Sequence, residues 1–151
     1  MRVRFEKKPR RYGLYVEREN APALCLPTAP GYDDWLPHDL LHFVAEAELG
    51  LDGGVFGDLA AGGNARIFVP VDKTLVAKMW RSQRIKKRRL PDGRRSEELA
   101  AELERAWKTR RYDDDLAPVV EKLDALAEEW HSLEIGRSLT LEWPRPERRR
   151  H

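Results

Sequence analysis

Two histidines and two acids occupy neighbouring positions in the segment PHDLLHFVAE, which contains His38, Asp39, His42 and Glu46. On a helix each residue advances by about 100°, so these four side chains share one face, opposite an apolar stripe that would pack on the core. Residues four apart are separated by about 6 Å along the axis, and two imidazoles at that spacing can bind one cation. The pattern therefore predicts a divalent-metal site, with zinc as the favoured ion.

Each acid in this group has a predicted role. Glu46, one turn beyond His42, is predicted to be a third ligand or the carboxylate that orients His42. Asp39 is predicted to act in the same way beside His38. Two imidazoles and one carboxylate leave a coordination position open for water, as in catalytic zinc sites. We therefore expect a metal-dependent hydrolase or lyase acting on a small molecule, with Glu46 or Asp39 as the base.

Two local resemblances cover the same region. The blocks LPHDLLHF at 36–43 and GVFGDLAAGG at 54–63 resemble those of a group of uncharacterised bacterial proteins. The pentapeptide HDLLH at 38–42 also resembles the HDxxH zinc segment of the Coq-four-type ubiquinone-biosynthesis proteins, which implies that both histidines and the aspartate between them are ligands. The chain departs from that family at its downstream glutamate, because Gly54 stands twelve residues after His42.

The distribution of charge supports a different hypothesis. Residues 73–95 carry ten basic side chains against Asp92 alone, whereas residues 96–134 carry five basic and twelve acidic ones. Clustered cations bind nucleic-acid phosphates, so segment 78–95 predicts, as the alternative, a nucleic-acid-associated protein. The basic segment could equally lie beside the acidic helices of the same chain. The candidate nucleic-acid-binding residues are Arg81, Arg84, Lys86, Lys87, Arg88 and Arg89.

Two further interpretations stay open. The face that contains both histidines also has the composition of a solvated helix face, on which the imidazoles bind nothing. A non-enzymatic protein-interaction domain, which would present an apolar surface patch instead of a metal or nucleic-acid site, is the other alternative.

The predicted elements run as strands, then helices, then a strand, without regular alternation, and this order favours an α+β fold. Alternating apolar residues predict an N-terminal hairpin within residues 1–20 and further strands at 23–26 and 138–143, and residues 66–71 are predicted to form a strand or an extended segment. Helical periodicity predicts helices at 35–49, 55–60, 75–89, from residue 96 onward and at 116–133. We expect a small antiparallel sheet, made of the hairpin and the C-terminal strand, with three to four helices packed on it.

Local signals predict how the helices begin and end. Asp33 or Asp34 is expected to cap the helix at 35–49, and Gly50 is expected to end it in a left-handed conformation. Ser96 is expected to cap the helix that follows it. The glycines between 50 and 63 are expected to form turns with positive φ around a short helix that packs on Phe43 or Trp35.

Composition limits the class of protein. Charged residues make up 36% and hydrophobic residues 41% of 151 residues, which is typical of one globular domain. We place this α+β domain at 1–143, and the basic, proline-containing sequence at 144–151 predicts a disordered tail. The chain has neither an apolar run of about 20 residues nor the apolar stretch of a signal peptide, and we expect no membrane partner. Cys25 is the sole cysteine, so no internal disulfide can form, and a cytoplasmic location is expected.

Overall fold

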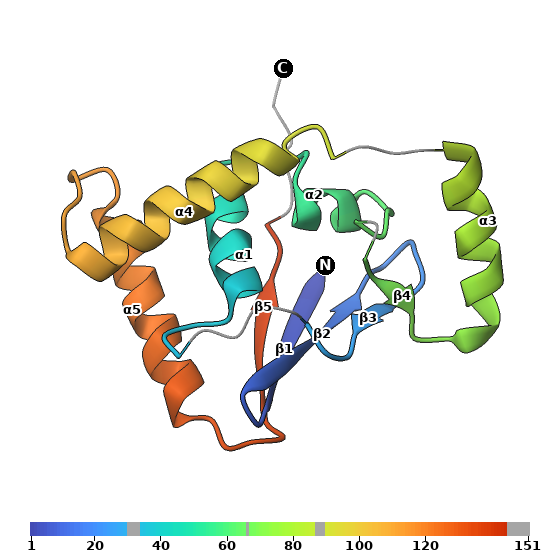
Figure 1. The fold of residues 1–151 in the computed structure, drawn as a ribbon, viewed down its shortest axis with the longest axis horizontal. Coiled ribbons are helices and arrows are strands. Elements are labelled where there is room, and N and C mark those ends of the chain that lie inside the picture. Colours follow the sequence, from blue (N-terminus) through green and yellow to red (C-terminus); the bar gives the residue numbers. More distant parts are fainter. Residues whose placement is uncertain (30–33, 66, 87–89, 145–151) are drawn as a thin grey trace.

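The computed structural model describes residues 1–29, 34–65, 67–86 and 90–144, and the strands within them form an antiparallel sheet in the order β4-β3-β2-β1-β5 (Figure 1). The strands are β1 (Arg2–Lys8), β2 (Arg11–Glu17), β3 (Leu24–Leu26), β4 (Val69–Pro70) and β5 (Ser138–Glu142). The helices are α1 (His38–Glu48), α2 (Val55–Ala60), η1 (Lys73–Leu75), α3 (Val76–Lys86), α4 (Gly93–Thr109) and α5 (Ala117–Ser132). The predicted α+β fold, with the C-terminal strand beside the hairpin, is confirmed.

The sheet buries one of its two faces. Phe5 on β1 lies opposite Leu14 on β2 and Leu139 on β5, and all three side chains are buried. Residues at odd and even positions of a strand point to opposite faces, so the neighbouring Arg4 and Tyr15 lie on the other face, where the guanidinium sits 4.2 Å from the ring centre. The alternating apolar and polar residues that predicted the hairpin are thus explained, because helices cover only the face that contains Phe5, Leu14 and Leu139.

Helix α1 lies at the centre of the helical layer. Its Phe43 ring meets Phe5 of the sheet edge-on at 6.4 Å and Phe56 of α2 at 5.0 Å, as predicted for the short helix. Helices α4 and α5 also pack on α1, and every residue from 40 to 46 is buried (Figure 1). Because α1 is covered on more than one side, polar residues on the face opposite the sheet are buried as well.

Two predicted boundaries are wrong. Helix α1 begins at His38, with Pro37 as the preceding cap residue and no capping side chain, whereas the prediction began at 35 with Asp34 as one candidate cap. A residue before proline avoids the helical conformation, so Leu36 cannot continue the helix upstream. The other candidate cap, residue 33, lies outside the described residues. The segment predicted at 66–71 forms a strand only over Val69–Pro70, because the N–H groups of Ile67 and Phe68 donate to the carbonyl of Asn64 in a turn.

The predicted cap of α4 is also wrong. The helix begins at Gly93, and the Ser96 N–H already donates to the carbonyl of Asp92 in a regular helical bond of 2.8 Å. Its side chain therefore points into the core instead of closing the helix end. Gly50 does adopt the predicted positive φ, at 72°. Gly54 has φ −90°, and a glycine stands there because the Glu46 carboxylate approaches its backbone closely.

Helix α3 stands at the edge of the molecule, and its main contacts are with η1 and β4 (Figure 1). The described residues do not include 87–89, the end of the helix predicted at 75–89. They also exclude 145–151, which is all but the first residue of the tail predicted to be disordered. None of the helices in the described part of the chain is both long enough and apolar enough to cross a membrane.

Candidate metal centre

His38 and His42, one turn apart on α1, point their rings toward each other. Their Nε2 atoms are 3.0 Å apart, and the rings meet edge-on with centres 4.6 Å apart. His42 is 4% exposed, whereas His38 is exposed to solvent. The predicted convergence of the two imidazoles is therefore present, with one ring held in the interior and the other at the surface.

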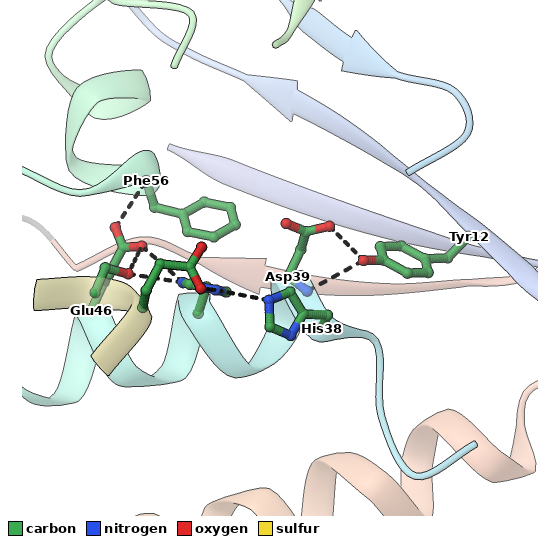
Figure 2. Close-up of polar contacts among 8 residues, drawn as sticks. Tyr12, His38, Asp39, Glu46 and Phe56 are labelled. Carbon is green, nitrogen blue, oxygen red and sulfur yellow. Dashed lines mark hydrogen bonds and ion pairs between the residues drawn. The ribbon is translucent and has the colours of Figure 1, made fainter. Parts of the chain in front are cut away.

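A hydroxyl from α4 determines which nitrogen of His42 is free. Ser96 Oγ donates to Glu46 Oε2 at 2.8 Å, and His42 Nδ1 lies 2.9 Å from Ser96 Oγ (Figure 2). Since the hydroxyl hydrogen is directed at the carboxylate, Nδ1 must donate its own hydrogen to Oγ. Neutral His42 then has its lone pair on Nε2, the atom that faces His38. A ring oriented in this way is prepared to bind a metal through Nε2.

The carboxylate of Glu46 is fixed from the opposite side by α2. Glu46 is completely buried, and its Oε1 accepts the backbone N–H of Phe56 at 2.9 Å (Figure 2). A negative charge is favourable there, because the first N–H groups of a helix have no partner within it. Gly54 leaves the room that this requires, since a Cβ at its position would lie 2.3 Å from Glu46 Oε1. The glycine-rich loop thus closes over the carboxylate.

Glu97, the residue after Ser96, completes a group of three possible ligands. Its Oε2 lies 3.4 Å from His42 Nε2, and one ligand atom each from His38, His42 and Glu97 lie within 4.8 Å of one another. Zinc–ligand bonds of about 2.1 Å in a tetrahedral arrangement separate the ligand atoms by about 3.4 Å. The two separations of 3.0 and 3.4 Å are close to that value, and the third, between His38 and Glu97, is at most 4.8 Å, so the group could hold an ion after its side chains adjust.

Asp39 turns away from this group toward the sheet. It lies on the same turn of α1 as His38, but its Oδ2 accepts the hydroxyl of Tyr12 on β2, and its own N–H donates to that hydroxyl oxygen at 3.3 Å (Figure 2). Its charge still acts on both histidines and on Glu97. Asp39 therefore contributes negative potential next to the cluster from a position that Tyr12 holds fixed.

Burial changes the protonation equilibria of all three enclosed groups. Burial lowers the pKa of His42, with Glu97 opposing that effect. Burial also raises the pKa of Asp39 and of Glu46, and for Glu46 the Ser96 hydroxyl and the N–H groups at the start of α2 act in the opposite direction. The low pKa of His42 favours the neutral imidazole, which is the form that binds a metal.

The structure thus brings together both predicted histidines, and it places the two predicted acids around them in different ways. Glu46 Oε2 is 3.9 Å from His42 Nδ1, on the side of the ring away from His38. Sequence reasoning missed Glu97 and Ser96, which come from another helix. Ser96 continues upstream the buried stripe of α4, which includes Leu99 and Leu103, and a serine in line with that stripe was the available signal.

The other predicted site residues lie in and after α3. Arg81 is exposed on α3. Arg84 and Lys86 belong to the same helix, but the structure does not describe their side chains. Lys87, Arg88 and Arg89 lie outside the described residues.

Comparison of the chain with known proteins gave no significant match to a protein-family model, to a curated protein or to a solved structure. The function proposed below therefore depends on the geometry of this site alone.

Proposed function

We propose that the protein binds a divalent metal ion, with zinc as the favoured ion, through His38, His42 and Glu97. The observation that supports this most directly is the convergence of three ligand atoms within 4.8 Å, together with the fixed orientation of His42 by Ser96. Two imidazoles and one carboxylate form a donor set that zinc accepts in catalytic sites. In this proposal Glu46 orients His42 through Ser96, while Glu97 is the third ligand.

The charges around the cluster favour a cation. Glu97 lies beside the histidines, the Asp39 charge acts on both of them, and Glu46 lies behind Ser96. A divalent ion would be attracted by all three carboxylates. In the metal-free protein the short Nε2–Nε2 contact needs one hydrogen, which must come from His38 because His42 donates through Nδ1. The ion would replace that hydrogen.

The proposed chemistry is hydrolysis or a lyase reaction on a small molecule. Three protein ligands leave a fourth position for water, and the exposed His38 and Glu97 place that position on the solvent side. If His38, His42 and Glu97 held zinc, the ion would supply hydroxide near neutral pH, because zinc lowers the pKa of its bound water to about 7. The sequence-based role of Asp39 as the base is not retained, because its carboxylate turns toward Tyr12, and from there its charge acts on the cluster without reaching the open position.

The test is metal analysis of the purified protein, followed by zinc titration against a chromogenic chelator. We expect one zinc per chain, and we expect stoichiometric uptake to be lost in the double variant His38→Ala/His42→Ala and strongly weakened in Glu97→Gln. The matched controls are His131→Ala, which removes an exposed imidazole at the end of α5, and Glu98→Gln, which changes the adjacent exposed acid.

Both controls should bind zinc like the unmodified protein. A purified protein that takes up no zinc at neutral pH would overturn the proposal, and so would unchanged uptake by the double histidine variant. If zinc binds normally to Glu97→Gln, the two histidines remain as ligands and Glu97 is excluded.

A further inference from the structure

Helix α3 presents a cationic face that includes an aromatic ring. Lys78, Trp80 and Arg81 are exposed, and the Trp80 indole has a relative exposure of 48%. With about 100° per residue, these three side chains fall within an arc of about 160° on the helix. Met79, on the other side, faces the body of the protein, where its sulfur accepts the Asn64 side-chain amide at 3.2 Å. The exposed arc is therefore the outer surface of α3.

The acidic segment of the chain does not cover this surface in the described residues. Helix α3 packs mainly on η1 and β4, whereas the acidic helices α4 and α5 lie on the far side of α2 (Figure 1). The acids of α4 and α5 pair with cations of their own neighbourhood, as Glu98 does with Arg94 and Asp124 with Arg110. Among the described carboxylates, none forms an ion pair with Lys78 or Arg81.

The charge of this region is strongly one-sided. Residues 73–95 have ten basic side chains and one acidic one, in a chain whose net charge is only +2. Arg94 and Arg95 of this segment pair with Glu98, whereas Lys78 and Arg81 on α3 have no carboxylate partner among the described residues. Cations of the latter kind attract a polyanion, and binding releases the counterions condensed on its phosphates. The exposed indole adds a flat apolar surface that a nucleobase can cover.

We propose that the outer face of α3 binds single-stranded nucleic acid, with Lys78 and Arg81 contacting phosphates and Trp80 stacking on a base. A single strand is favoured over a duplex because bases inside a duplex already stack on each other and offer no free face to an indole. An anionic membrane is a poorer match, because a helix that lies on a membrane needs a broad apolar face, and Met79 of α3 is turned inward.

The experiment measures binding of a fluorescein-labelled oligothymidine by fluorescence anisotropy over a range of salt concentrations. The unmodified protein should bind at low salt and lose affinity steeply as salt rises. Trp80→Ala should weaken binding about tenfold. The double variant Lys78→Gln/Arg81→Gln should reduce the slope of log affinity against log salt by about 1.4, at about 0.7 for each lost phosphate contact.

The matched control is Arg11→Gln/Arg111→Gln, which removes the same charge from exposed positions on β2 and after α4. It should keep the salt slope of the unmodified protein and all but a small part of its affinity. Equal losses in the two double variants would overturn the proposal, because they would show a response to net charge alone. The proposal also fails if no binding occurs at low salt, if a duplex competes as well as the single strand, or if the protein binds phosphatidylserine vesicles but not the oligonucleotide.

Discussion

Replacing Ser96 by alanine removes one hydroxyl from the centre of the proposed site. The residue is 1% exposed, and its oxygen links His42 Nδ1 at 2.9 Å to Glu46 Oε2 at 2.8 Å. Alanine leaves an imidazole N–H and a carboxylate oxygen without this partner in the interior. A buried polar group without a hydrogen bond costs about 1–3 kcal/mol. Because Glu46 keeps its bond from Phe56, we expect the free energy of unfolding to fall by about 2–4 kcal/mol in total.

The assay is urea unfolding at neutral pH in the presence of a chelator, so that metal does not contribute. Ser132→Ala is the matched control, because that serine lies exposed at the end of α5 and its hydroxyl donates only to the carbonyl of Glu129. The control should change the unfolding free energy by less than about 0.5 kcal/mol. Zinc titration of the same proteins adds a second measurement, in which Ser96→Ala should bind about 10–100 times more weakly.

The two measurements separate a positioning role from a merely structural one. If Ser96→Ala is as stable as the control, the hydroxyl does not connect Glu46 to His42 in the way described. If the variant loses stability but keeps its zinc affinity, the network supports the fold without orienting the ligand. Only a loss in both measurements agrees with a serine that positions His42 for the metal.

Three further predictions concern the surroundings of the site and the packing of the helices. Gly54→Ala should lower the unfolding free energy by about 1–3 kcal/mol, because its Cβ would meet Glu46 Oε1, and unchanged urea stability would refute the close approach. The Arg110 guanidinium lowers the pKa of Asp124, so the ionised pair stabilises the fold above the unfolded-state pKa of about 3.9, and this contribution is lost as the pH falls through the lower folded-state pKa. Asp124→Asn should therefore lower the free energy of unfolding at pH 7, by no more than about 1 kcal/mol because the pair is exposed, and should leave it unchanged near pH 2. Equal losses at both pH values would contradict this prediction. Free zinc at 100 times its dissociation constant should add about 2.7 kcal/mol to the unfolding free energy, and a chelator should reverse the resulting rise in Tm.

The sequence predicted the parts of the fold that follow from periodicity. The hairpin, β5 and the long helices α4 and α5 have apolar side chains at the spacing of one buried face, and that spacing is the same in the structure. The predicted ends were less accurate because tertiary contacts determine them. Ser96 resembles an N-cap in the sequence, yet α4 begins three residues upstream of it, at Gly93, and the Ser96 hydroxyl bonds to buried Glu46 and His42.

The candidate site could be predicted only as far as one helix extends. The i and i+4 spacing fixes that His38 and His42 share a face, whichever way the helix packs. It contains no information about which side chains of α4 cross that face, since Ser96 and Glu97 are more than fifty positions away in the sequence. Nor could it show that the N-terminus of α2 would hold Glu46, because this contact depends on how the glycine-rich loop folds back on α1.

The different exposure of the two histidines suggests how one site can be both rigid and accessible. His42 is held through Ser96 by a carboxylate that the backbone of α2 fixes in turn, so its Nε2 has a defined position before any ion arrives. His38 and Glu97 are exposed, so their side chains can rotate to bring their ligand atoms to zinc-binding separations from His42 Nε2. One anchored ligand and two adjustable ones would let an ion enter from solvent without opening the core. A stability loss confined to variants of Ser96 and Glu46, with little change for His38→Ala, would agree with this division.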